Sequence, residues 1–328
     1  MTVRQIRPLP HTTKRTHDTV FAIGALFVLL LILRNAEFAM EGIRRGITLC
    51  MQSVIPALFP FMVITDLSAS FGVGDALPHF LTSPLRKLLR LSPAGTVAIL
   101  LGFLCGFPIG TKYAIRAHEN GRIGDAECER VLLLSCSPSA AFLISAVGTS
   151  LWKNTRFGIL LYLTTILSSL LCGTALARTA KEAPEPLPSA SAPMQRTPVG
   201  TLFTGAIRSS THGILLICAY VLFFSALGET LGTLCSALSL SHAWSTPLAM
   251  MLELSGGMSA AAESPSLFCA ALCAFGSAWS GLSMHCQMLA ICQNRPFSYR
   301  RFLPFKLLQG AVSTLLLILL FPLMKFEF

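Results

Sequence analysis

Charged residues are scarce in this chain. Lys, Arg, Asp and Glu make up 12% of its 328 residues, whereas a soluble domain carries about 25%. Acidic residues are the scarcer kind, with 15 Asp and Glu against 25 Lys and Arg. This composition argues against a soluble protein, and its excess of positive charge fits cytosolic loops beside anionic lipid. The basic residues are not interleaved with aromatic ones, so nucleic acid is not an expected partner.

Signatures of enzymes and metal sites are also missing. The sequence has no Gly-x-Ser-x-Gly elbow and no His-Glu-x-x-His zinc motif. Lys112 follows Gly110 and Thr111 but lacks the upstream glycine of a phosphate-binding loop. The eleven cysteines sit mostly inside apolar runs without zinc-finger spacing, so we expect them to pack as small apolar side chains. We therefore predict a protein that is not an enzyme and that has no catalytic residues, metal or cofactor.

Long apolar runs are abundant. Hydrophobic residues make up 53% of the chain and its mean hydropathy is +0.66. A membrane-spanning helix needs about 20 apolar residues, and the sequence indicates spans at Val20–Leu33, Gly46–Phe71, Phe157–Ala177, Gly213–Leu231 and Phe302–Met324. We predict an all-α polytopic integral membrane protein. Basic residues before the first run favour a cytosolic N-terminus, and residues 72–93 are predicted to form a loop.

A proline-rich segment divides the chain into two halves of similar length. Residues 178–199 contain Pro184, Pro186, Pro188, Pro193 and Pro198, and this composition is typical of a linker. The predicted organisation is an N-terminal cytosolic segment with the first span (1–45), a first membrane repeat (46–177), the linker (178–199) and a second membrane repeat (200–328).

Helix breakers interrupt the apolar runs of the first repeat. The stretch Gly106–Lys112 lies inside the run Ala94–Ile115 and places a lysine at membrane depth. Cys136–Ser139 separates two short helical runs, Ala126–Ser135 and Ala140–Leu151, each too short to span a bilayer alone. Such breaks are tolerated in lipid only where the backbone is buried in protein or lines a wet cavity.

The second half follows the same plan. Thr201–His212 is a short amphipathic run ahead of the span. Pro247–Glu253 is predicted as a half-helix that ends at Ser255–Gly257, and Pro265–Ile291 as a long segment broken near residues 277–281. Broken helices at corresponding places in two repeats are the pattern with which secondary transporters build their substrate sites.

Polar residues beside these breaks are the candidates for solute binding. The N-terminus of a half-helix presents free N–H groups and a positive dipole end, which bind carboxylate or phosphate. Lys112 adds a positive charge, so the pattern favours an anionic solute. The predicted site residues are Gly106, Pro108, Gly110, Lys112, Ser137, Ser139, Glu253, Ser255, Gly256, Ser283, His285 and Gln287.

Two alternatives stay open for this site. Lys112 and Glu253 could pair with each other across the two halves, and the serines could serve only close helix packing, as small residues do in bilayers. Asp66, Glu229 and Glu263 lie near span ends, where an interfacial charge is the simpler interpretation.

Five stretches of the chain resemble a known family. They are Gly106–Lys112, Glu127–Leu133, Phe142–Gly148, Leu252–Gly257 and Gly281–Gln287. They resemble the sporulation integral membrane proteins of the YlbJ (SpoVV) type, in the nucleoside-recognition Gate group, which is similar to concentrative nucleoside transporters. The resemblance implies a role in endospore formation, with dipicolinate as the solute and the outer forespore membrane as the location.

The leading hypothesis is therefore a transporter of a small organic anion in a bacterial cell membrane, with dipicolinate as the expected solute. A nucleoside-type carrier is one alternative. A membrane protein that assembles or senses the spore envelope without transporting anything is another. The expected partners are the organic anion and the lipid bilayer, while a coupling ion and a homo-oligomer are left open.

Overall fold

The computed structural model describes residues 11–71, 79–179, 198–237 and 244–324. In these ranges every regular element is a helix. Four helices are long and apolar enough to cross a membrane, and two sharply bent helix pairs raise the number to six if each pair is one span. The all-α membrane fold predicted from the sequence is thus confirmed. Most of the proline-rich linker lies outside the described residues.

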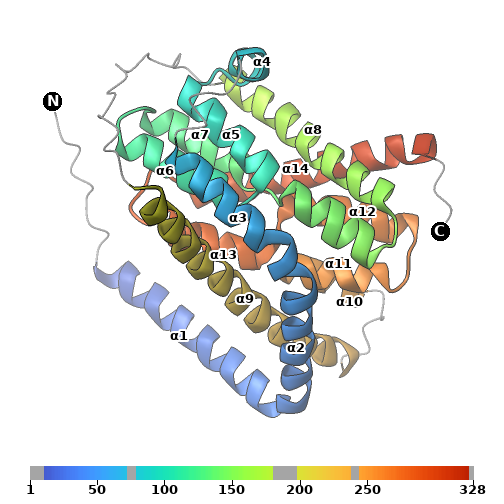
Figure 1. Cartoon of the computed structure of the whole chain (residues 1–328). Coiled ribbons are helices and arrows are strands. Elements are labelled where there is room, and N and C mark those ends of the chain that lie inside the picture. Colours follow the sequence, from blue (N-terminus) through green and yellow to red (C-terminus); the bar gives the residue numbers. More distant parts are fainter. Residues whose placement is uncertain (1–10, 72–78, 180–197, 238–243, 325–328) are drawn as a thin grey trace.

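Figure 1 shows the helices in chain order from blue to red. Those of the first half are α1 (His11–Arg34), α2 (Ala36–Leu49), η1 (Cys50–Val54), α3 (Ile55–Ser70), α4 (His79–Leu89), α5 (Pro93–Cys105), α6 (Ile109–Glu119), α7 (Asp125–Ser135), η3 (Ala141–Leu151) and α8 (Thr155–Thr179). Those of the second half are α9 (Val199–Ala237), α10 (Ser245–Leu252), α11 (Leu254–Ala262), α12 (Leu267–Trp279), α13 (Gly281–Ile291), α14 (Tyr299–Leu320) and η5 (Phe321–Met324).

Both halves contain two broken segments followed by a closing helix. In the first half the broken segments are α5–α6 and α7–η3, and α8 closes the half. In the second half they are α10–α11 and α12–α13, and α14 closes the half. The predicted breaks near Gly106, Cys136 and residues 277–281 are therefore present. Symmetry between the two halves stays a prediction.

The predicted loop at residues 72–93 is wrong in its second part. Helix α4 occupies His79–Leu89 and meets α5 at a bend of 105°. Apolar residues at helical spacing explain this helix, because Leu85 and Leu89 lie one turn apart on the face that packs on the core and Leu89 is fully buried. Pro84 lies inside α4, so the proline did not mark a loop here.

Two further boundaries differ from the prediction. The amphipathic run at 201–212 and the span at 213–231 form one helix, α9, because no proline lies within residues 201–231. The break between α10 and α11 lies at Glu253, whose backbone is extended, and not at Ser255–Gly257. These three residues belong to the first turn of α11, so their glycines allow close packing instead of ending a helix.

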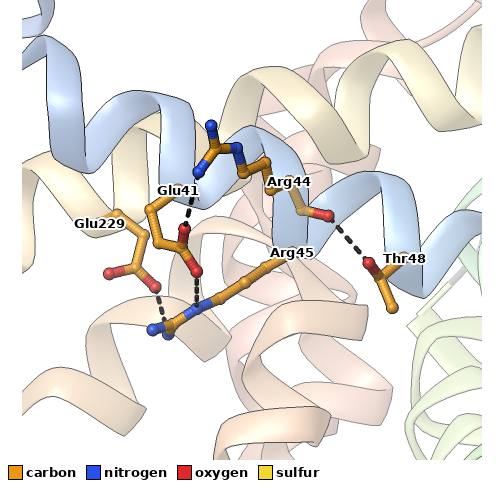
Figure 2. A network of polar contacts seen from close by, with 5 residues as sticks. All are labelled: Glu41, Arg44, Arg45, Thr48 and Glu229. Atoms are coloured by element: carbon orange, nitrogen blue, oxygen red, sulfur yellow. Dashed lines mark hydrogen bonds and ion pairs between the residues drawn. The ribbon is translucent and has the colours of Figure 1, made fainter.

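Helices from the two halves pack directly on each other. A Cβ at Gly42 of α2 would lie 2.6 Å from the carbonyl oxygen of Ser225 on α9, so only glycine permits this crossing. An exposed polar network extends the contact: Arg45 Nη1 lies 2.8 Å from Glu229 Oε1, and Glu41 forms ion pairs with Arg44 at 3.9 Å and Arg45 at 3.5 Å (Figure 2). Glu229 thus pairs with Arg45 across the halves, and its predicted place at the membrane interface stays a prediction.

The closing helices complete the connection between the halves. Helix α14 packs against α8 as well as α12, while α1 lies at the edge of the molecule, beside α9 and joined to α2 (Figure 1). The broken segments are therefore enclosed by longer helices on several sides.

Buried Glu127 fixes the start of α5, because its Oε1 accepts from the main-chain N–H of Ser92 at 2.6 Å.

Candidate functional site

The two breaks of the first half contact each other. Gly106 ends α5 with φ +75° and ψ −174°, a conformation that is nearly specific to glycine. A Cβ there would lie 2.5 Å from the main-chain nitrogen of Ser139. The next residue, Phe107, donates its N–H to the carbonyl oxygen of Ser137 at 2.8 Å. This hydrogen bond therefore joins a free N–H group at one break to a free carbonyl group at the other.

The two breaks of the second half also meet. Ser280 and Gly281, between α12 and α13, have φ of +73° and +77°. A Cβ at Gly281 would lie 3.0 Å from the nitrogen of Leu254 and 3.2 Å from the Cα of Glu253. A backbone turn at Ser280 thus fits against the extended residue that separates α10 from α11.

All four breaks converge on one cavity of about 60 Å³, here called cavity 1. Phe107, Pro138, Glu253 and Ser280 represent the four breaks in its wall. The remaining lining residues are Val54, Leu58, Ser139, Phe142, Ile217, Val221, Leu254, Ser255, Ser283, Met284 and Gln287. Of the predicted site residues, Ser139, Glu253, Ser255, Ser283 and Gln287 are therefore brought together here.

Glu253 is the charged residue that lines cavity 1. Its side chain is buried, and its Oε1 and Oε2 accept from the N–H groups of Ser255 and Gly256 at 2.9 and 2.6 Å. The carboxylate thus caps the N-terminus of α11. We predicted that free N–H groups at half-helix N-termini would hold an anion, and at α11 this is wrong because Glu253 already occupies them.

The other half-helix N-termini near the cavity differ from α11. Ser139 Oγ accepts from the N–H of Phe142 at 3.1 Å and so caps the start of η3. The start of α13, at Ser280, has no side-chain cap. Ser283, in the first turn of α13, lies next to Gln287, whose amide donates to Ser283 Oγ at 3.4 Å. The first turn of α13 therefore presents uncapped donors beside a polar wall.

Lys112 lies in a second, larger cavity of about 290 Å³, here called cavity 2. Its other lining residues are Asp66, Leu101, Ile109, Tyr113, Arg116, Thr201, Leu202, Gly205, Ala206 and Ser209. Within the described part of the chain, neither Lys112 nor Arg116 forms an ion pair. The alternative pairing of Lys112 with Glu253 is therefore wrong, because the break at Gly106–Pro108 directs α6 and its lysine away from cavity 1.

The other predicted residues lie in or behind the walls. Pro108 follows Phe107 in the break, and Gly110 lets α6 approach Gly102 of α5 closely. Ser137 is buried and binds Phe107 through its carbonyl group. His285 is buried and bonds to the Trp279 carbonyl and the Tyr299 hydroxyl at 2.9 and 3.1 Å. Through these contacts the residues support the walls of cavity 1, although they do not line the cavity themselves.

Lys306 was not among the predicted site residues. This residue lies inside α14 with no exposed surface. Its ammonium group donates to the carbonyl oxygen of Cys136 at 2.7 Å and to Gln309 Oε1 at 2.9 Å. The signal was available, because a lysine inside the predicted span Phe302–Met324 is costly in a membrane and suggests a function.

All eleven cysteines are free thiols, and most are buried, as their apolar surroundings predicted. Within the described ranges, no group of three or more His, Cys, Asp or Glu side chains is placed to hold a metal ion.

The comparisons with known proteins agree with a transporter-like membrane fold. No protein-family model matches the chain. The chain is 23% identical to the sporulation integral membrane protein YlbJ of Bacillus subtilis (strain 168), over 90% of this chain and 80% of YlbJ. Its fold is similar to that of CNTnw, a concentrative nucleoside transporter solved in an inward-facing substrate-bound state. The TM-score is 0.50, the identity 12%, and the match covers 93% of this chain and 82% of CNTnw.

Proposed function

We propose that this protein transports a small organic anion across a bacterial membrane during endospore formation, and that cavity 1 is its solute site. The observation that carries the proposal is the convergence of four helix breaks on this cavity. Breaks leave backbone groups without helical partners, and membrane proteins tolerate such groups at the walls of solute sites. The sporulation role is proposed from the name of the YlbJ relative.

An anionic solute is supported by the distribution of positive charge. Lys112 and Arg116 line cavity 2 on α6, the helix that follows the Phe107 break. Lys306 lies behind the break that contributes Pro138 to cavity 1. The charge of Glu253 is offset by the two N–H groups that it accepts and by the positive end of α11. Dipicolinate, a small planar dianion, is the solute that we propose.

A nucleoside-type carrier is the second candidate, because of the chemistry of cavity 1 itself. The aromatic side chains Phe107 and Phe142 lie in its wall together with the polar groups of Gln287 and Glu253. Apolar walls with a few placed polar groups are usual for small organic ligands in general. The third candidate, a spore-envelope assembly or sensing protein, requires no transport. None of the three candidates includes a catalytic step.

Uptake into proteoliposomes separates these candidates. The purified protein is reconstituted, and the entry of labelled dipicolinate and labelled uridine is measured against protein-free vesicles. We expect protein-dependent uptake of dipicolinate that excess unlabelled dipicolinate competes away. Uptake of uridine alone would support the nucleoside-type carrier, and uptake of neither solute would support the assembly or sensing role. A spore-forming host that lacks the protein should accumulate less dipicolinate in its spores.

A further inference from the structure

Lys306 places a positive charge at the end of a half-helix. Helix α7 ends at Ser135, and Cys136 is its C-cap residue. The last carbonyl groups of a helix have no intrahelical donors and form the negative end of its dipole. In broken membrane helices, such ends coordinate cations. Here the Cys136 carbonyl accepts from the Lys306 ammonium group at 2.7 Å.

The surroundings of Lys306 offer little else to compensate its charge. Within the described residues it forms no ion pair, and besides the Cys136 carbonyl it donates to Gln309 Oε1 at 2.9 Å. The C-terminal end of α7 is therefore the main compensation for this buried charge.

The break that Lys306 contacts also accepts the Phe107 N–H at its Ser137 carbonyl oxygen, but polar atoms around it are unpaired in the described residues. In the described structure, Ser137 Oγ and Gln309 Nε2 are buried without a hydrogen-bond partner. Pro138 and Ser139, which follow Ser137 in the chain, line cavity 1. A change in the position of Cys136 would therefore move the wall of this cavity.

We propose that the Lys306 ammonium group is a built-in cation at the C-terminal end of α7, which holds the Cys136–Ala140 break in place so that this wall of cavity 1 keeps its shape without a bound metal ion. The inference rests on the proposed function only in treating cavity 1 as a solute site. Lys306 is a positioning residue, since it does not line the cavity.

The protection of Cys136 from alkylation tests this inference without any solute. Cys136 is buried in the break, and exposed Cys286 serves as an internal reference in the same chain. The full-length protein in lipid nanodiscs is treated with N-ethylmaleimide in sodium, potassium or choline chloride, and the labelling of each cysteine is followed by mass spectrometry. We expect Cys136 of the wild type to be equally protected in all three salts.

Variants then separate the charge from the space that the side chain fills. Lys306→Met removes the charge, and Lys306→Gln removes it but keeps N–H donors. In both, Cys136 labelling should rise at least about tenfold, equivalent to about 1.4 kcal/mol of opening free energy, while Cys286 labelling stays constant. Leu317→Ala, at a buried apolar position of the same helix, is the control and should leave Cys136 protected.

Three results would overturn the inference. They are full Cys136 protection in folded Lys306→Met, protection in Lys306→Gln equal to that of the wild type, and loss of wild-type protection when sodium is replaced by choline. If neither variant folds, the salt comparison on the wild type decides the question. Failure to transport any solute would contradict the proposed function but would leave the labelling result unaffected.

Discussion

The main-chain N–H of Phe107 donates a 2.8 Å hydrogen bond to the carbonyl oxygen of Ser137. This bond joins the break of α5–α6 to the break of α7–η3 and satisfies two backbone groups that helical hydrogen bonding leaves unpaired. Phe107 and the neighbours of Ser137 then form one side of cavity 1. The breaks are therefore parts of one wall instead of independent irregularities.

The first prediction concerns the contact between these breaks. Gly106→Ala places a Cβ 2.5 Å from the Ser139 nitrogen, at a φ of +75°. Backbone strain of this kind costs about 1–3 kcal/mol, and the contact adds to it. We expect lower thermal stability and loss of solute uptake. Gly121→Ala is the matched control, because Gly121 also has a positive φ but nothing within 4 Å of a Cβ, and it should retain uptake.

The second prediction concerns the cap formed by Glu253. Glu253→Ala leaves the Ser255 and Gly256 N–H groups without their acceptor, and loss of such a cap costs about 1–2 kcal/mol. Both thermal stability and solute binding should fall. Ser266→Ala is the control, since Ser266 caps α12 but does not line cavity 1, and it should lower stability alone. Unchanged binding by Glu253→Ala would remove Glu253 from the proposed site.

The third prediction concerns charge in cavity 2. Lys112→Met keeps the apolar stem and removes a cation that has no ion-pair partner among the described residues. An opposite charge about 4 Å away is worth about 1 kcal/mol in water and more in a partly buried site. Dipicolinate uptake should therefore fall at least about fivefold at low salt, and less at high salt because ions screen the charge. Normal uptake by the folded variant would exclude Lys112 from anion recognition.

The fourth prediction concerns the pairing of Lys112 with Glu253. Because they line different cavities, the stability effects of Lys112→Met and Glu253→Gln should add to within about 0.5 kcal/mol in the double variant. Thermal unfolding of the two single variants and the double variant measures this. Restored stability in the double variant would indicate a direct pair, contrary to the structure.

The fifth prediction concerns the linker. A protease site inserted at residues 186–190 should be cleavable in the folded protein, and the halves should stay associated. The reason is that α2 packs on α9 and α8 packs on α14 across the halves. Size-exclusion chromatography in detergent and uptake after cleavage are the measurements. Separation of the halves on cleavage would show that the linker holds them together.

The sequence by itself determined the membrane class and most of the places where helices break, although the break at Glu253 was placed two residues too late. Apolar runs of spanning length and scarce charge required burial in lipid, and Gly106 and Pro108 interrupt the helix between α5 and α6. These are local properties of the chain, because they depend on solvation and on backbone torsions within a few residues. Where local signals conflicted, as for the leucine-rich segment His79–Leu89 among its prolines, the tertiary contacts of Leu89 decided in favour of a helix.

Only the tertiary structure decided which polar residues share a site. In the sequence, Glu253 and Lys112 are both charged residues beside a helix break. In the structure, Glu253 caps α11 and lines cavity 1, whereas Lys112 lines cavity 2. The apolar wall residues, such as Val221 on α9, carry no local mark of their position. The contact of Lys306 with Cys136 joins the last helix to the first half. Such relationships depend on how distant helices cross, and a helix's own sequence does not specify the partner that it meets.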